Sequence, residues 1–476
     1  MKVRNKAISI GFTRSGTHPL NLLAYQKILS KEGIRVFAVC EGEIEKKEYG
    51  SDLQVYCFEQ WLKSHWGELK CKNLETYQKK YPDINLWEIF YTDRYIRYKY
   101  NYNDAVKFII GMIRFWEEIL ETEKASYLIS DCIIGAENFL GMIVGKKMGI
   151  PYISIVCGRN EKNKSFFSCN EGFRNMEFNR LMESGYVATD EEKRLAEQFI
   201  NSYKDSKKQP FYMKNTVMQS RRLCSTFWAY IKKVKHVYYL FDGRFYNKFN
   251  PQLYHSRRER MEPALEPIRR MYIKKYFQNP DYREDYILYP LHFQPEASTC
   301  VYARKYENQL FFIEQLAKSI PVGKILYVKE HSVRVGHRPI SFYKQILKYP
   351  NVKLIAPGAD IHTLIQNSAF LIVLTSTAGF EALMYEKPVF VCGDVFYEGF
   401  SGVKKIRDVF DEKESFLIPP KQDRKRYMNQ MACYLKTLKV CTTREEPLYE
   451  CSKKELRSLQ KLSMKCLLDY LSISNG

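Results

Sequence analysis

The sequence predicts an α/β protein made of two Rossmann-like domains that face each other across a cleft, with a helical basic insertion between them. Short apolar runs rich in β-branched and aromatic residues stop abruptly at polar or small residues, as expected for buried strands. In two parts of the chain these runs alternate with helix-like stretches, which favours parallel sheets covered on both faces. The length of 476 residues is enough for two such domains.

The first domain opens with a predicted strand at residues 7–12, a helix at 19–32 and a strand at 34–40. This βαβ order places the intervening small polar loop at the carboxyl edge of the sheet. The loop lacks the G-x-G-x-x-G pattern of dinucleotide-binding proteins. It is either a tight turn capped by Ser15 or Thr17, or a contact for an acceptor substrate. The candidate acceptor-binding residues are Arg14, Ser15, Gly16, Thr17 and His18.

Two acidic residues follow the next predicted strand of this domain. Residues 46–123 are typical of helices, residues 127–130 of a strand that ends at Asp131, and residues 152–156 of a further strand. An acid at a strand end can act as a general base toward an acceptor hydroxyl. Asp131 can equally cap the following helix. Glu137 is the second candidate if it lies on an exposed first turn; otherwise it is a surface acid that favours the helix dipole.

The middle of the chain has weaker periodicity and is strongly basic. Residues 207–275 contain several Lys and Arg doublets, and aromatic residues lie between them. This composition suits an anionic membrane interface, or single-stranded nucleic acid stacking on the rings. It also fits a helical subdomain with solvated lysines and buried tyrosines. No pattern of a known nucleic-acid-binding module is present, so we expect no nucleic-acid partner.

The second domain repeats the alternation of strands and helices. Strands are predicted at residues 286–289, 325–328, 352–355, 370–374 and 389–392. Helices are predicted at residues 302–319, 340–348 and 361–367, the last capped by Asp360. After Pro419-Pro420 the chain reads as helical to its end, with an amphipathic stretch at residues 454–471.

Polar residues follow three of these strands and are expected to meet at one sheet edge, where open α/β sheets bind ligands. The first group is His292, Gln294 and Glu296, the second is Lys329, Glu330, His331 and Ser332, and the third is Thr375, Ser376, Thr377, Gly379 and Glu381. Hydroxyls and a glycine at a helix start suit a phosphate, because the backbone N–H groups and the helix dipole are available there. The same residue types are ordinary helix caps.

These residues resemble the bacterial capsule polysaccharide biosynthesis family, which includes the Kdo transferases. The similar segments are Gln294-Pro295-Glu296, Lys329-Glu330-His331-Ser332, and the loop from Thr375 to Ala382 followed by Lys387-Pro388. The family usually has proline where this chain has Ser332, and serine can still donate a hydrogen bond. The resemblance covers residues 286–397 well and implies a GT-B glycosyltransferase with CMP-Kdo or another nucleotide sugar as donor. The acceptor that it implies is a lipid-linked or other saccharide.

The expected roles follow from this resemblance and from the residue types. Ser376, Thr377 and Gly379 would bind the donor phosphate, and His331 would donate a hydrogen bond to it. Lys329 would pair with that phosphate or with Glu330, and Glu381 would hold a ribose hydroxyl. Gln294 and Glu296 would line the sugar pocket. The expected catalytic residues are Asp131, Glu137 and His331.

Composition limits the remaining possibilities. The chain has 75 Lys and Arg against 54 Asp and Glu, a net charge of +21, which favours polyanionic or phosphorylated partners. Its 13 cysteines form no C-x-x-C pair, which argues against a disulfide framework or a zinc site and suits a reducing cytosol. No apolar run reaches the length of a membrane span. We expect no cofactor or metal, and a cytoplasmic protein with peripheral binding to the inner face of the plasma membrane as an option.

The predicted domain boundaries are residues 1–165 for the acceptor domain, 166–282 for the basic-aromatic segment, 283–435 for the nucleotide-sugar domain and 436–476 for helices that pack back on the first domain. Two alternatives on the same fold are a teichoic-acid-type glycerol or ribitol phosphate transferase and a nucleotide-sugar epimerase. A third alternative, from a different class, is a non-catalytic protein that binds anionic lipid or nucleic acid.

Overall fold

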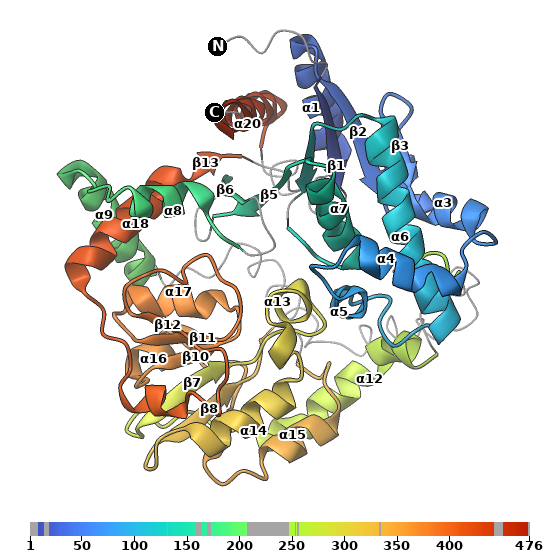
Figure 1. The fold of residues 1–476 in the computed structure, drawn as a ribbon. Coiled ribbons are helices and arrows are strands. Elements are labelled where there is room, and N and C mark those ends of the chain that lie inside the picture. The colour runs from blue at the N-terminus through green and yellow to red at the C-terminus, as the bar shows by residue number, and fades with distance from the viewer. Residues whose placement is uncertain are drawn as a thin grey trace. The chain divides into compact units, whose positions relative to one another are not determined.

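The computed structural model describes residues 8–13, 19–130, 132–158, 163–168, 173–206, 247–252, 254, 257–332, 335–441 and 451–474. The chain divides into two compact units. Unit 1 comprises residues 1–183, 247–254 and 436–476, and unit 2 comprises residues 184–246 and 255–435. Each unit is built on its own sheet (Figure 1). The two Rossmann-like domains expected from the sequence are therefore confirmed, and their arrangement around a cleft stays a prediction.

The sheet of unit 1 has seven strands in the order β13-β6-β5-β4-β1-β2-β3. Its strands are β1 (Ser9–Thr13), β2 (Arg35–Cys40), β3 (Gln54–Cys57), β4 (Tyr127–Ser130), β5 (Tyr152–Cys157), β6 (Lys164–Ser168) and β13 (Lys439–Val440). The five strands from β1 to β5 pair in parallel in the Rossmann order 3-2-1-4-5. Strand β6 pairs antiparallel with β5, and β13 pairs antiparallel with β6. The sequence analysis missed β3, β6 and β13. Residues 46–123 are therefore not helical throughout, because the alternately buried segment Gln54–Cys57 extends the sheet beside β2.

Helices cover this sheet, and the last helix of the chain is one of them. The helices of unit 1 are α1 (Pro19–Leu29), α2 (Glu43–Lys46), α3 (Phe58–His65), α4 (Leu74–Lys80), α5 (Leu86–Thr92), α6 (Tyr102–Thr122), α7 (Ala136–Lys147), α8 (Met176–Glu183) and α20 (Lys453–Ser474). Met464, Leu467 and Leu471 of α20 join the core formed with β1 and α1. Gln460 Nε2 also donates to Asn21 Oδ1 at 2.8 Å. The C-terminal helix is thus part of the first unit.

The sheet of unit 2 is six-stranded and fully parallel, in the order β12-β11-β10-β7-β8-β9. Its strands are β7 (Tyr286–Pro290), β8 (Ile325–Lys329), β9 (Val352–Ile355), β10 (Leu371–Val373), β11 (Val389–Val391) and β12 (Val403–Lys405). Numbered within the unit, this is the Rossmann order 3-2-1-4-5-6, in which the strand order reverses between β7 and β10. Buried tyrosines contribute to this sheet: the rings of Tyr286 and Tyr327 stack at 4.0 Å.

The helices of unit 2 are α9 (Asp190–Ser206), α12 (Arg257–Ile273), α13 (Ala297–Cys300), α14 (Gln309–Ser319), α15 (Ile340–Ile346), α16 (Ile361–Asn367), α17 (Thr377–Met384) and α18 (Arg424–Thr437), whose last residues reach into unit 1. The single helix predicted at residues 302–319 is wrong. The chain forms α13 earlier and restarts at Gln309, because the Asn308 side chain accepts from the N–H groups of Leu310 and Phe311. Asp360 caps α16 as expected, accepting from Thr363 N at 3.0 Å.

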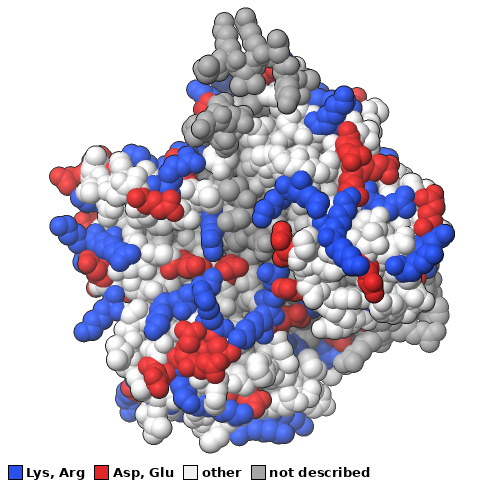
Figure 2. Space-filling view, in the orientation of Figure 1, with Lys and Arg blue, Asp and Glu red and all other residues white. Residues whose placement is uncertain are grey.

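Most of the predicted basic segment, residues 207–246, lies outside the described residues. Its described flanks are helical, in α9 and α12. In the part of the chain that the structure describes, no helix is long and apolar enough to cross a membrane. On the face seen in Figure 2, basic and acidic side chains are interspersed over both units.

Candidate functional site

The candidate site of unit 2 lies at the point where its strand order reverses. His292 follows β7 and Thr375 follows β10, and these two strands are neighbours in the sheet. The backbone N–H of Thr375 donates to His292 Nε2 at 3.1 Å, so one hydrogen bond joins the two strand ends. The Thr375 hydroxyl donates to the Ser298 carbonyl at 2.9 Å. The structure therefore brings together two of the three groups of polar residues that the sequence analysis selected.

His292 has a buried donor without an acceptor. Because Nε2 accepts from Thr375, the proton of the neutral ring is on Nδ1. Among the described residues this Nδ1 has no hydrogen-bond partner, and the side chain is 6% exposed. Burial, with the nearby His331 and Arg338, lowers the pKa of His292 to about 3, so the ring is neutral at pH 7. Buried donors without partners are rare in native proteins, which marks this position as a place for a ligand acceptor.

The group that follows β8, the second of the three, is joined to the group after β7 through Arg338. Glu330, directly after β8, has no exposed surface and forms an ion pair with Arg338 at 2.7 Å. Its carboxylate also accepts from the Tyr343 hydroxyl at 2.6 Å and from the His331 N–H at 2.7 Å. Arg338 donates in addition to the carbonyl of His292. Glu330 thus holds the loop after β8 in place through buried, charge-assisted hydrogen bonds.

Lys329 is buried, and its amine donates to two backbone carbonyls, those of Glu330 and Pro357, each at 3.2 Å. The expected pairing of Lys329 with the Glu330 carboxylate is not what the structure has, because Arg338 pairs with that carboxylate instead. Burial lowers the pKa of Lys329 to about 8, while Glu330 and Asp360 partly offset the effect. The Lys329 amine therefore joins the loops that follow β8 and β9, and it places a buried positive charge at these loops.

His331 and Ser332 lie on the half-buried rim of the same loop. Burial is the main reason why the pKa of His331 is lowered to about 4, and the ring is neutral at pH 7. Its Nδ1 is buried and has no hydrogen-bond partner among the described residues. His331 also lies close enough to His292 to contribute to the lowered pKa of that ring.

Gln309 is a residue that sequence reasoning missed. Its buried side-chain amide accepts from the Tyr289 hydroxyl and from His292 N, and donates to His292 O and to Gln294 Oε1 at 2.7 Å. Gln294 also donates to the Glu307 carbonyl. Gln294 therefore supports the turn after β7. The sequence analysis also missed Arg338. A glutamate directly after a buried strand needs a cation as partner, and this requirement was the signal in the sequence.

The loop between β10 and α17 has an ordinary N-cap. The Ser376 side chain accepts from Ala378 N at 3.1 Å, and the Ser376 carbonyl accepts from Gly379 N and from the Tyr397 hydroxyl. Because the Ser376 oxygen accepts this bond, its hydroxyl hydrogen can still be donated to a ligand. Any Cβ at position 379 would collide with Tyr397, so glycine here permits close packing. Thr377, half-buried, begins the helix.

Glu296 and Glu381 have different surroundings. Glu296 precedes α13, is half-buried, and accepts from the Ser298 hydroxyl at 3.3 Å. Glu381 lies one turn inside α17 and is buried, near Tyr385. Of the two, Glu296 is the one whose side chain reaches solvent.

The residues expected to contact the acceptor are only partly described in unit 1. Arg14, Ser15, Gly16, Thr17, His18 and Asp131 lie outside the described residues. Glu137 is in the first turn of α7, as expected, but it is buried rather than exposed. Beside it, Asn138 Nδ2 donates to Thr13 Oγ1 at 3.2 Å, which joins α7 to the end of β1. This is the reversal point of the first sheet, between β1 and β4.

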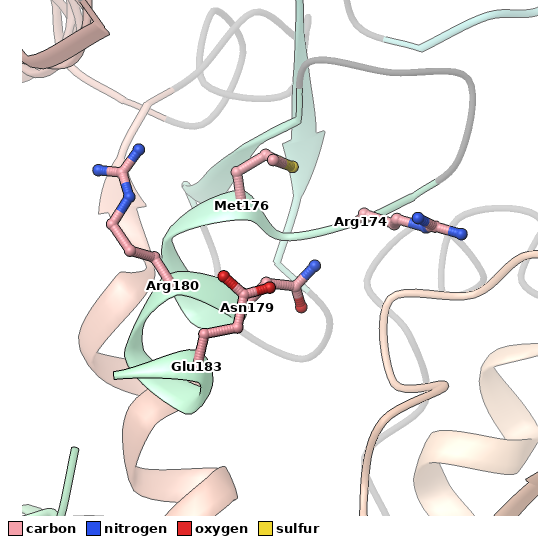
Figure 3. Close-up of a pocket in the computed structure, with 5 residues that line it drawn as sticks. All are labelled: Arg174, Met176, Asn179, Arg180 and Glu183. Carbon is pink, nitrogen blue, oxygen red and sulfur yellow. The ribbon is translucent and has the colours of Figure 1, made fainter. Parts of the chain in front are cut away.

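A separate polar hollow lies on α8 of unit 1. It is lined by Arg174, Met176, Asn179, Arg180 and Glu183. Arg174 and Arg180 point in different directions, so their charges do not converge on one ligand position (Figure 3). In the described residues no group of three His, Cys, Asp or Glu side chains is placed to hold a metal ion.

Comparison with known proteins gives a family match for unit 2. Residues 273–432 match the model of the family described as capsule polysaccharide biosynthesis protein. No curated protein sequence matches the chain.

Several solved structures align over most of the chain at low identity. A Thermosulfurimonas dismutans KpsC, a beta Kdo 2,4 transferase, has 13% identity over 66% of this chain and 80% of that chain, with a TM-score of 0.37. A Methanocaldococcus jannaschii UDP-GlcNAc 2-epimerase in complex with UDP-GlcNAc and UDP has 11% identity, coverages of 90% and 98%, and a TM-score of 0.30. Anabaena Alr3699/HepE in complex with UDP and glucose has 10% identity, coverages of 98% and 99%, and a TM-score of 0.28. We draw neither activity nor substrate from similarities this low.

The matched segment contains all three groups of strand-end residues, from His292 to Glu381, together with Gln309 and Arg338. The resemblance noted in the sequence is therefore confirmed for this part of the chain. Over residues 273–432, the chain is similar to the capsule polysaccharide biosynthesis protein family.

Proposed function

We propose that the protein is a glycosyltransferase of capsule-type polysaccharide synthesis, with a nucleotide-activated sugar as donor and a lipid-linked or other saccharide as acceptor. The observation that carries the proposal is the cluster at the reversal point of unit 2. It presents the buried Nδ1 atoms of His292 and His331, without partners among the described residues, within the segment that matches the family. Ligands of open α/β sheets bind at such reversal points.

The chemistry proposed for this cluster is binding of the donor phosphate and stabilisation of the charge that it gains on departure. Neutral His331 donates an N–H, the Ser376 hydroxyl donates a second hydrogen bond, and Lys329 adds positive charge from below. Preorganised donors and charges of this kind favour a transition state in which negative charge develops on the leaving group. Because these groups come from the chain itself, we propose transfer without a divalent metal.

The acceptor is proposed to bind at the reversal point of unit 1, with Asp131 or Glu137 as the base. Glu137 adjoins Asn138, whose amide reaches the end of β1. A carboxylate there would take the proton from the attacking hydroxyl. CMP-Kdo is the proposed donor, and the proposed location is the cytoplasm or the inner membrane surface.

The experiment is a donor panel with the full chain in EDTA: CMP-Kdo, UDP-GlcNAc and CDP-glycerol, with released nucleotide measured by chromatography. Hydrolysis and transfer both release nucleotide, so the acceptor need not be known. We expect release from CMP-Kdo that is lost in His331→Ala and retained in Arg283→Met, which breaks a mostly exposed ion pair of unit 2. If only CDP-glycerol releases nucleotide, phosphate-ester transfer replaces the proposal. If UDP-GlcNAc is isomerised without release of nucleotide, epimerisation replaces it. No turnover of any donor would contradict the proposal.

A further inference from the structure

Unit 1 carries a row of surface aromatic rings between α5 and α6. Trp87 and Tyr102 have ring centroids 5.7 Å apart, Trp87 and Tyr91 6.3 Å, and Tyr91 and Tyr98 5.8 Å. Each successive pair is inclined by only 32° to 39°. The tyrosines are the exposed members, with 45% of Tyr91, 64% of Tyr102 and 81% of Tyr98 accessible. We call Trp87, Tyr91, Tyr98 and Tyr102 the aromatic row.

Tyr98 adopts a backbone conformation that tyrosine rarely tolerates. Its φ is 63°, in the left-handed region that favours glycine. Neither burial nor core packing explains a strained residue whose side chain is mostly in solvent. Strain of this kind persists where the surroundings impose it, and it concentrates at ligand sites. The conformation therefore suggests that the position of the ring is used.

The same segment is attached to the candidate acceptor site. Asp93, at the end of α5, is buried and accepts from Tyr95 N and Ile96 N through Oδ1, at 2.7 and 3.1 Å. Its Oδ2 accepts from Ala136 N at 3.1 Å, at the start of α7 and next to Glu137. One carboxylate thus fixes both the turn that carries Tyr98 and the helix that carries the candidate base. The turn that carries Tyr98 is therefore held to the start of the helix that carries the candidate base.

The chemistry of the row fits an acidic saccharide. Sugar rings present C–H faces that pack on aromatic faces, and the tyrosine hydroxyls can hydrogen-bond to sugar hydroxyls. Arg94 and Arg97 lie against the rings of Tyr95 and Tyr98, at 4.8 and 5.6 Å from the centroids. Within residues 86–102 the two basic side chains beside the rings, Arg94 and Arg97, outnumber the exposed acid Glu88, since Asp93 is buried. The third basic residue, Lys99, donates from its amine to the carbonyls of Pro251 and Tyr254 and is not counted.

A membrane is the less suitable partner for this surface. Helices that lie in a bilayer interface insert Leu, Phe or Trp into the hydrocarbon boundary. Within residues 86–102 the exposed large hydrophobic side chains are all tyrosines. We propose that the aromatic row is a binding platform for the acidic saccharide part of the acceptor, an inference that rests on the proposed transfer function.

The test measures saccharide binding in variants that leave the net charge unchanged, so that general attraction of the +21 chain to polyanions stays constant. The variants are Tyr98→Gly, which suits the left-handed backbone, and Tyr102→Ala, which suits the first turn of a helix. Controls are Tyr282→Ala, a 39% exposed tyrosine in unit 2, and Asn163→Gly, which replaces another left-handed residue, with φ 58°, without changing the charge. Binding to polygalacturonate is measured by affinity electrophoresis, and the melting temperature by calorimetry.

We expect the dissociation constant for polygalacturonate to rise about fivefold to tenfold in Tyr98→Gly and in Tyr102→Ala. The dissociation constant should be unchanged in Tyr282→Ala, and the melting temperatures of Tyr98→Gly and Asn163→Gly should be no lower than that of the parent. Unchanged polygalacturonate binding in both row variants overturns the proposal. So does a loss confined to phosphatidylglycerol vesicles or to oligo(dT), tested in parallel.

Thermal stabilisation of the same proteins by CMP separates this proposal from the proposed transfer function. A row variant that loses saccharide binding but keeps the CMP response supports the platform. If no nucleotide stabilises the parent while the row variants still lose saccharide binding, the platform stands as a saccharide site and the transfer function fails.

Discussion

At the scale of single residues, the candidate donor site depends on Arg338. This side chain is 9% exposed, pairs with the fully buried Glu330, and also reaches the carbonyl of His292. Arg338 connects the ends of β7 and β8. Removing its guanidinium charge would leave the Glu330 carboxylate buried without a partner cation. Both histidines of the site therefore depend on a residue that does not belong to the recognisable motifs.

Replacing Arg338 by methionine should destabilise unit 2 by about 3–5 kcal/mol, because it leaves the Glu330 carboxylate buried without its cation. Calorimetry of the full chain measures the effect. Adding Glu330→Gln should recover part of the loss, since the neutral amide does not require the cation. Arg283→Met, which breaks a mostly exposed pair with Asp281, is the control and should change little. If Arg338→Met were as mild as this control, the buried pair would not hold the site together.

The pH dependence of stability should report His292. Its pKa is about 3 in the folded chain, below the usual value of 6.5, so the unfolded chain binds one more proton between these values. Stability from this group is complete above about pH 6.5 and is lost as the pH falls toward 3, with a slope of about 1.4 kcal/mol per pH unit. Urea unfolding between pH 7 and pH 4 should show a smaller slope in His292→Asn. An unchanged slope would mean that His292 is not buried in its neutral form.

At the scale of elements, the helix start at Ser376 combines a cap with a candidate phosphate contact. Ser376→Ala and Asp360→Ala each remove one N-cap in unit 2, of α17 and α16 respectively. Each should cost about 1 kcal/mol of stability by chemical denaturation. Only Ser376→Ala should also reduce stabilisation by nucleotide. Equal nucleotide responses in the two variants would leave Ser376 with a capping role alone.

The sequence was sufficient to predict the elements that have strong local patterns. The strands from Tyr286 and Ile325 and the cap at Asp360 were predicted because a buried strand and a capped helix have signals within a few residues. The contacts Glu330–Arg338 and His292–Thr375 could not be predicted, because they depend on how loops from different strands meet. Strand β3 was missed because Gln54–Cys57 is too short to stand out between helices.

At the scale of the whole molecule, each unit forms its own core, and the chain end belongs to the first. Leu467 is fully buried among β1 and α1 residues, whereas Leu462 on the same helix is 42% exposed. Trp61, Trp66, Trp87 and Trp116 all lie in unit 1, so tryptophan fluorescence reports mainly that unit. The two units should therefore be distinguishable during unfolding.

Leu467→Ala should destabilise unit 1 by about 2–5 kcal/mol, the usual cost of a cavity in a core. The measurement is the urea midpoint of tryptophan fluorescence. Leu462→Ala is the matched control, and it should change stability by less than about 0.5 kcal/mol. The nucleotide response of unit 2 should survive both changes. Loss of that response in Leu467→Ala would indicate that the units are not independent cores.

The central claim is that the strand ends of unit 2 bind the phosphate of a nucleotide, and its most direct test is thermal stabilisation without added metal. The ligands are CMP, CDP, UDP, UMP, GDP and ADP, and the proteins are the parent, Ser376→Asp and Asp360→Ala. A nucleotide at about 100 times its dissociation constant adds about 2.7 kcal/mol to native stability. Aspartate at 376 keeps a cap but places a negative charge against the phosphate. We predict that CMP raises the melting temperature of the parent and of Asp360→Ala but not of Ser376→Asp. No response to any nucleotide, or an equal response in all three proteins, would contradict the claim.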